Sequence, residues 1–135
     1  MQAFAVPLGR SGVSLDLKPL PPHQVLGHPV LLGQIFNSLI ANALESMEQG
    51  GQLRVEVVRQ DRRSLTLRLS DTGRGMSEQQ QRMAFRPFFT TKQGGLGVGL
   101  VLVKRIMERF GGSVRLSSRE GVGTSVSLSF RLIKS

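Results

Sequence analysis

Residues 64–75, SLTLRLSDTGRG, decide the fold of this chain. From Ser64 to Ser70 apolar and polar residues alternate strictly, which is typical of a strand that is buried on one side only. In the strand predicted at 52–59, Leu53, Val55 and Val57 also alternate with polar residues, and the polar link at 60–63 is short enough for a hairpin. One face of this hairpin is apolar and the other is rich in arginine, so we expect the sheet to pack a core on a single side.

The rest of the chain predicts helices and strands around this hairpin. Before the hairpin we expect a strand at 13–17, a proline-rich connector at 18–22, a short edge strand at Val25-Leu26, and a helix that begins at Pro29 and is ended by Gly50-Gly51. After the hairpin we expect a short helix at 77–83 capped by Ser77, a loop at 85–97, and a helix at 98–110 closed by Gly111-Gly112. The last two strands are expected at 113–117 and 124–132. The helix from Pro29 has an apolar face of Leu32, Phe36, Leu39, Ala43 and Met47. These elements predict an α+β fold, a two-layer sandwich in which about three helices cover one face of a mixed, mostly antiparallel sheet of about five strands. We expect a single domain over 1–135, with its core at 12–132.

The composition limits the chemistry that the chain can perform. It has 135 residues, a net charge of +9 and 39% hydrophobic residues, an ordinary globular balance. Because the sequence has no cysteine, disulfides, cysteine-ligated zinc, iron–sulfur clusters and a thiol nucleophile are excluded, and two histidines argue against a histidine-rich metal site. The sequence contains no apolar run of about 18 residues, the length that a membrane-spanning helix needs. The first residues also lack the pattern of a signal peptide.

The positive charge allows three interpretations: solvated faces, a docking surface for an acidic protein, or nucleic-acid binding. The basic residues are scattered, and the chain has no Trp, no Tyr and 7 Phe, so stacking platforms for bases are sparse. We therefore favour solvated faces and expect no nucleic-acid partner.

Three polar features stand apart from the predicted scaffold. Ser38, Asn42 and Glu45 share one face of the first long helix, where the alternative is a plain solvated face. Residues 71–76, DTGRGM, place a carboxylate and two glycines directly after an apolar strand, a pattern that suits recognition of an amino group on a ring but also fits an ordinary glycine turn. Residues 94–100, GGLGVGL, run into a helix and resemble a phosphate cradle, although a flexible loop has the same composition.

Taken together, the order and spacing of these features resemble the catalytic and ATP-binding domain of sensor histidine kinases, in the superfamily that also contains gyrase, Hsp90 and MutL and has the Bergerat ATP-binding fold. Asn42-Ala43 is similar to the N box, residues 71–75 to the G1 box, residues 86–92 (RPFFTTK) to the F box, residues 95–100 to the G2 box and residues 121–124 (GVGT) to the closing glycine motif. The resemblance covers about Val13 to Phe130.

The resemblance implies a role for each matching residue. Asp71 would accept a hydrogen bond from the adenine amino group, with Thr124 close by, and Gly73, Gly75 and Met76 would surround the base. Backbone N–H groups of Gly95, Leu96, Gly97, Val98, Gly99 and Leu100 would contact the phosphates of ATP, and Lys92 would reach the β- and γ-phosphates. Asn42 would hold Mg²⁺, with Ser38 and Glu45 as weaker candidates, so that Asn42 and Lys92 form the catalytic pair. Independently of the resemblance, we predict a mobile lid over residues 86–96, because its glycines and few apolar anchors make local opening cheap.

Two departures from the family pattern refine this interpretation. The family often has Asn, or in its ATPases and serine kinases Glu, at the position of Ser38, and a serine hydroxyl is no base near neutral pH. Ser38 therefore favours a histidine kinase over an ATPase or a serine kinase. Neither His23 nor His28 has the helical context of a phospho-acceptor, and we interpret both as structural.

We therefore expect a fragment of a longer two-component kinase that lacks the dimerisation and phospho-acceptor domain. The partners that this implies are that domain and a downstream response regulator. The fragment itself would be cytoplasmic, and its parent is expected to be either soluble or anchored in the inner membrane. The alternatives are a serine/threonine kinase or anti-sigma factor of the same fold, and a non-catalytic module that binds through its basic face.

Overall fold

The structure is a computed structural model that describes residues 13–17, 27–86 and 99–133 of the chain. One five-stranded sheet forms one layer, in the order β1-β2-β3-β5-β4. The strands are β1 (Val13–Leu17), β2 (Gly51–Gln60), β3 (Ser64–Asp71), β4 (Ser113–Arg119) and β5 (Gly123–Arg131). β1 runs parallel to β2 and the other three pairs are antiparallel, so the sheet is mixed and mostly antiparallel as predicted.

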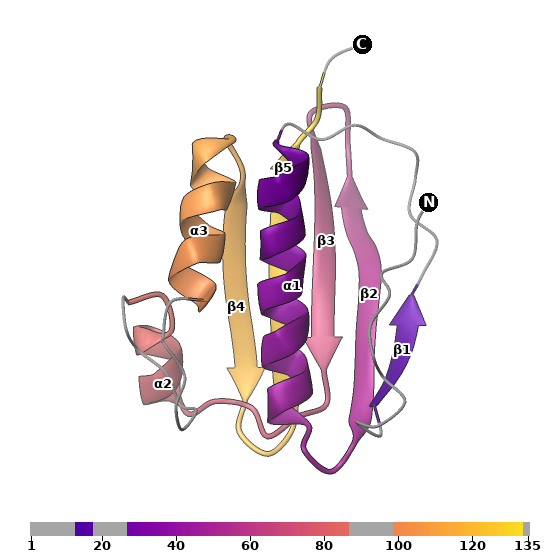
Figure 1. The fold of residues 1–135 in the computed structure, drawn as a ribbon, viewed down its shortest axis with the longest axis vertical. Helices are drawn as coiled ribbons and strands as arrows, with labels where there is room; N and C mark the ends of the chain where they lie inside the picture. The colour runs from indigo at the N-terminus through magenta and orange to yellow at the C-terminus, as the bar shows by residue number, and fades with distance from the viewer. Residues whose placement is uncertain (1–12, 18–26, 87–98, 134–135) are drawn as a thin grey trace.

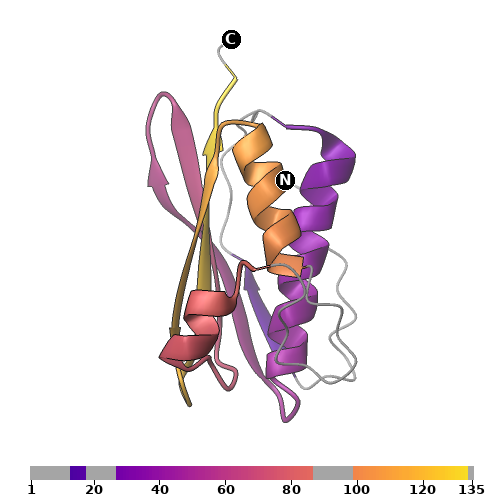
Figure 2. The ribbon, with the colours of Figure 1, turned by 90° about the vertical axis from the view of Figure 1, so that its left-hand side faces the viewer.

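The helices are α1 (Pro29–Ser46), α2 (Glu78–Met83) and α3 (Gly99–Arg109). α1 and α3 lie side by side on one face of the sheet (Figure 1), and the side view shows the two layers edge-on (Figure 2). The short helix α2 lies beside the β4 edge rather than over the sheet. The predicted fold class is confirmed, with this difference in the position of its smallest helix.

The core lies between the two long helices and the inner face of the sheet. Alternation in the strands works as predicted, since Leu65, Leu67 and Leu69 of β3 are all buried. The buried core consists of Ile35, Leu39, Ile40, Ala43, Met47, Leu53, Val55, Leu65, Leu67, Leu69, Val103, Ile106, Met107, Val126, Leu128 and Phe130. Two members of the predicted apolar face of α1, Leu32 and Phe36, are only partly buried and pack at its margin.

In the part of the chain that the structure describes, no helix covers the outer face of the sheet (Figure 2). Arg68 of β3 pairs with Glu56 of β2 at 2.8 Å, and hydroxyl groups meet across β3 and β5 at Thr66–Ser129 (2.8 Å) and Ser70–Ser125 (3.0 Å). Short polar side chains on this face satisfy one another, which is how a one-sided antiparallel sheet faces water.

Several element boundaries differ from the prediction. α1 ends at Ser46 rather than at the glycine pair 50–51, because the Ser46 carbonyl accepts from Arg74 N–H (3.1 Å) and Met47 caps the helix. β4 continues to Arg119, two residues beyond its predicted end at Ser117. The helix predicted from Val98 to Phe110 is observed from Gly99 to Arg109. The predicted edge strand at Val25-Leu26 lies outside the described residues.

Helix starts are well explained by capping. His28 caps α1 through its Nδ1, which accepts from Val30 N–H at 3.2 Å, and Pro29 occupies the first turn. Ser77 and Gln80 form a reciprocal capping box at the start of α2, as the predicted Ser77 cap requires. Among the described helices none is long and apolar enough to cross a membrane.

Candidate nucleotide site

The carboxylate of Asp71 lies at the end of β3, where the strand leads into the glycine-containing loop. Its Oδ1 accepts hydrogen bonds from the backbone N–H of Gly73 (2.9 Å) and of Thr124 (3.2 Å). Thr124 is the direct neighbour of Asp71 in the β3–β5 register, so the strand pairing itself brings these two predicted site residues together. The carboxylate is thus fixed in position by local turn geometry on one side and by the sheet on the other.

Burial raises the pKa of Asp71 above its ordinary value of 3.8, and hydrogen bonds from Gly73, Thr124 and Ser46 oppose that rise without cancelling it. A partly buried acceptor that is already oriented by fixed donors is suited to a ligand that offers a further hydrogen-bond donor.

The loop after Asp71 packs against the end of α1. A side chain at Gly73 would meet the Ser46 carbonyl oxygen at 2.7 Å, closer than real Cβ contacts, so the backbone approach here requires glycine. Next to it, Thr72 accepts from Gln52 N–H at 2.9 Å through its hydroxyl. The start of the loop is therefore fastened both to α1 and to β2.

The same loop also packs against the β4–β5 turn. Gly75 has φ +70°, and a Cβ on it would overlap the backbone of Arg119. The Arg74 carbonyl accepts from Gly121 N–H at 2.7 Å, which joins the loop to the closing glycine motif. Two motifs about 45 residues apart in sequence thus form one continuous wall at the end of the sheet where β3 finishes.

Sequence reasoning missed two residues of this wall, Ser118 and Gln81. The Ser118 hydroxyl accepts from Met76 N–H (2.8 Å), and Gln81 Nε2 donates to the carbonyls of both Met76 (3.0 Å) and Ser118 (2.9 Å). One signal could have found Ser118: it continues the inward register of Val114 and Leu116 on β4, where a polar residue needs a partner.

Asn42 lies on α1 one turn before Ser46 and faces the start of α3. A Cβ built on Gly99 would stand 3.6 Å from Asn42 Nδ2 and 3.9 Å from its Oδ1. Leu100 follows Gly99 in the first turn of α3. The side chain of Asn42 therefore lies beside the N-terminus of α3. Of the two weaker candidates, Ser38 is partly buried and Glu45 is exposed.

These positions give the site two ends on one helix. Ser46 contacts the loop that follows Asp71, and the side chain of Asn42, one turn earlier, lies close to the N-terminus of α3. In Figure 1 the C-terminal end of β3, the β4–β5 turn and the C-terminal end of α1 lie at the same end of the molecule. Lys92, Gly95, Leu96, Gly97 and Val98, together with the predicted lid except Arg86, lie outside the described residues.

Metal binding by protein side chains alone is not supported in the described part of the chain, where no three His, Asp or Glu residues gather into a cluster. The amide oxygen of Asn42 is nonetheless a ligand type that Mg²⁺ accepts, and this ion commonly takes one or two protein ligands together with phosphate oxygens and water. The donor set therefore fits a magnesium ion that arrives with a phosphate ligand.

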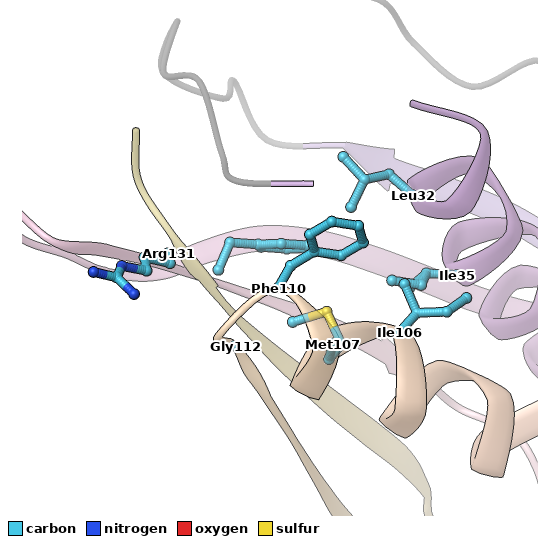
Figure 3. Close-up of a pocket in the computed structure, with 8 residues that line it drawn as sticks. Leu32, Ile35, Ile106, Met107, Phe110, Gly112 and Arg131 are labelled. Atoms are coloured by element: carbon cyan, nitrogen blue, oxygen red, sulfur yellow. The ribbon is translucent and has the colours of Figure 1, made fainter. Parts of the chain in front are cut away.

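A small apolar hollow occurs at the other end of the helix pair (Figure 3). Its volume is only about 10 Å³, barely enough for one water molecule, and none of the predicted site residues lines it. Its walls come from the first half of α1, the end of α3 and β5: Leu32, Ile35, Ile106, Met107, Phe110, Gly112, Phe130 and Arg131. We regard it as a packing gap in the core.

Among the described residues, the basic side chains do not form one patch. Arg68 and Arg115 occupy the outer face of the sheet, whereas Lys104, Arg105 and Arg109 are exposed on α3, on the helix side of the molecule. Lys104 is also engaged, since its Nζ lies 5.7 Å from the centre of the Phe85 ring.

The protein-family model described as histidine kinase-, DNA gyrase B-, and HSP90-like ATPase matches residues 27–134. Sporulation kinase E of Bacillus subtilis (strain 168) is 35% identical over 113 residues, which make up 83% of this chain and 15% of that kinase. Sensor histidine kinase ZraS of Salmonella typhimurium is 32% identical over 100 residues, 74% of this chain and 22% of its own length. The chain thus spans less than a quarter of these two relatives.

A solved structure of the mycobacterial sensor histidine kinase MprB superposes with a TM-score of 0.82 at 25% identity, covering 93% of this chain and 88% of that one. These matches confirm the resemblance that the ordered motifs predicted. The chain therefore belongs to the histidine kinase-, DNA gyrase B- and HSP90-like ATPase family.

Proposed function

We propose that this domain binds Mg-ATP and donates the γ-phosphate to a histidine on a separate domain of the same two-component kinase. The observation that carries the proposal is the placement of Asp71, whose Oδ1 is held by Gly73 and Thr124 in the wall that the loop and the β4–β5 turn build together. Membership of the ATPase family and the relatives named as kinases support the same assignment.

In the proposed complex each end of the site has its own task. Asp71 accepts from the exocyclic amino group of adenine, while Gly73, Gly75 and Met76 let the backbone lie close to the ring. The first N–H groups of α3, at Gly99 and Leu100, donate to the phosphates, where the helix dipole favours negative charge. Lys92 and the glycine-rich residues 95–98 complete the phosphate contacts.

Asn42 would hold a magnesium ion through its side-chain oxygen, and Glu45 would orient one of the water molecules of that ion. When bound, such an ion would supply charge neutralisation at the phosphates. The chemical step needs little from this domain beyond position: the acceptor imidazole supplies a lone pair, a new N–P bond forms, the bond between the γ-phosphorus and the β–γ bridging oxygen breaks, and ADP leaves.

The acceptor is proposed to lie outside this chain. His28 is already used as the helix cap of α1, with its Nδ1 accepting from Val30 N–H, and His23 lies outside the described residues. We propose a longer kinase that contributes a cytoplasmic dimerisation and phospho-acceptor domain and passes the phosphate to a response regulator.

The test is a transfer assay with radiolabelled Mg-ATP. The domain alone should take up no label, and addition of the parent's dimerisation domain should give a labelled acceptor. The label should be lost in acid and retained in base, as phosphohistidine is. An acid-stable label would indicate a serine or threonine kinase, and no nucleotide binding at all would refute the proposal.

A further inference from the structure

We propose that Ser46, the last residue of α1, is a positioning residue for Asp71, and that its hydroxyl holds the carboxylate in place and favours the ionised form of that group. The inference rests on the proposed function, because it concerns the group that would receive the base of ATP. It adds a residue to the site, since Ser46 lies outside all five motifs that carried the resemblance.

The packing around Ser46 brings its side chain against the loop that orients Asp71. The Ser46 carbonyl accepts from the N–H of Arg74 at 3.1 Å, which bonds the end of α1 to that loop. A Cβ built on Gly73 would overlap the Ser46 hydroxyl and stand 2.8 Å from Ser46 Cβ. Because the N–H of Gly73 donates to Asp71 Oδ1 at 2.9 Å, Ser46 is packed against the same turn that fixes the carboxylate.

The Ser46 hydroxyl has one proton and two acceptors that can compete for it. One acceptor is the carbonyl of Ala43, at 2.8 Å. Since the N–H of Met47 bonds to Leu44 (3.1 Å) rather than to Ala43, this carbonyl lies where the regular helix bonding ends. The other acceptor is the carboxylate of Asp71, whose pKa the hydroxyl helps to lower.

The effect on Asp71 depends on its protonation state. Burial raises the pKa of Asp71, and the N–H of Gly73, the N–H of Thr124 and the hydroxyl of Ser46 oppose this rise by donating to the charged form. Of these three donors, Ser46 alone contributes through a side chain. A hydrogen bond to an ionised carboxylate is stronger than one to a neutral group, so removal of this hydroxyl costs the ionised form more than the protonated form.

The charged side chains around Asp71 do not account for this response. Among the described residues, those on the surrounding elements are Glu45, Glu48, Arg74, Arg119 and Glu120. None of these charges contributes to the shifted pKa of Asp71, which follows from burial and hydrogen bonds. A change in the titration of Asp71 on loss of the Ser46 hydroxyl can therefore be assigned to the lost hydrogen bond.

The experiment follows the carboxyl carbon of Asp71 by NMR as pH is varied, in the nucleotide-free wild-type domain and in Ser46→Ala. The Asp71 midpoint should rise in Ser46→Ala, because the ionised form loses a donor. The carboxyl of Asp61 is the internal reference and should titrate identically in both proteins, since its donors Arg63 N–H (2.7 Å) and Ser64 N–H (2.8 Å) lie at the other end of β3. Ser117→Ala, which removes an exposed hydroxyl from β4, should leave both midpoints unchanged.

Calorimetry with Mg-ATP measures the consequence for binding. Ser46→Ala should weaken ATP roughly twofold to tenfold at neutral pH, the worth of one hydrogen bond. The acid limb of its binding profile should also move to higher pH, together with the Asp71 midpoint, because a higher pH is then needed to ionise the carboxyl. Ser117→Ala should match the wild type in affinity and in profile.

An unchanged Asp71 midpoint in Ser46→Ala, with or without a lower melting temperature, would assign Ser46 to the end of the helix alone and overturn the inference. If Ser46→Ala does not fold, Ser46→Cys provides the same measurement: a thiol is a weak donor, so the midpoint should again rise, and an unmoved midpoint would again contradict the assignment. A raised midpoint in a domain whose wild type binds no ATP would support the hold of Ser46 on Asp71 and refute the proposed function. Wild-type ATP binding with an unmoved midpoint refutes this inference alone.

Discussion

At the scale of single residues, Asp71 is expected to dominate base recognition. Asp71→Asn should weaken ATP about tenfold to a hundredfold, since a hydrogen bond to a charged group contributes about 1.5–3 kcal/mol. Equilibrium titration with Mg-ATP measures the change. Asp61→Asn is the matched control, because Asp61 caps the β2–β3 turn at the opposite end of β3 by accepting from Arg63 N–H (2.7 Å) and Ser64 N–H (2.8 Å). Equal ATP affinity in the wild type and Asp71→Asn would contradict the adenine contact.

The raised pKa of Asp71 predicts that ATP binding depends on pH. Only the ionised carboxylate accepts fully from the adenine amino group, so ATP affinity should fall as pH drops through the Asp71 pKa, which lies above 3.8. In the nucleotide-free protein the sign is opposite: a carboxyl whose folded pKa exceeds its unfolded value adds stability as pH falls through the folded pKa. Titrations across this range should show both trends, and Asp71→Asn should abolish them.

Gly75 offers a third test at this scale, because two separate constraints act on it. Gly75→Ala would place a Cβ in the left-handed region, φ +70°, and against the Arg119 backbone, and it should destabilise the fold by about 3 kcal/mol. Gly121→Ala is the control: its φ is +80°, but nothing lies within 4 Å of its Cβ, so it should cost only about 1 kcal/mol. Chemical denaturation measures both, and equal losses would mean that the Arg119 contact is unimportant.

At the scale of elements, α1 is expected to carry the metal ligand. Asn42→Ala should weaken Mg-ATP about tenfold or more and change the affinity for magnesium-free ATP far less, because the metal ligand is lost in the first case only. Asn37→Ala, exposed and on another face of the same helix, should behave as the wild type in both conditions. Titrations with excess magnesium and with a chelator distinguish the two. An equal loss in both conditions would assign Asn42 to packing instead.

The elements also show which parts of the fold a sequence can reveal. The strands β2, β3 and β5 were predictable because leucine, valine and phenylalanine alternate with polar residues and meet a single core. The end of α1 was not, because it depends on the Ser46 carbonyl finding Arg74, 28 residues away along the chain. Local glycine patterns carry no information about such a partner.

The same distinction holds in the site. Asp71, Gly73 and Gly75 could be found because the loop concentrates unusual residues directly after a strand. Ser118 continues the inward register of Val114 and Leu116, but this pattern singles it out from outer-face serines only once β4 is known to extend past Ser117. Gln81 has no distinguishing sequence context at all, since its two acceptors are backbone carbonyls brought together by the fold.

At the scale of the whole molecule, nucleotide should stabilise the folded domain. Mg-ATP at a hundred times its dissociation constant should add about 2.7 kcal/mol to the free energy of unfolding, because only the folded state builds the site. Thermal melts with and without Mg-ATP measure this shift. The Asp71→Asn protein at the same nucleotide concentration should show a much smaller shift, and identical melts for the wild-type domain with and without nucleotide would argue that no site exists.

One helix connects the two ends of the proposed site, and this has a consequence for the fate of the product. Asn42 and Ser46 are separated by about 6 Å along one turn of α1, so this helix fixes the spacing between the base end and the phosphate end of the proposed site. ADP carries the same base as ATP and would make the same contacts at the base end. The base contacts therefore cannot distinguish ADP from ATP. The replacement of ADP by ATP must be governed by contacts at the position of the γ-phosphate.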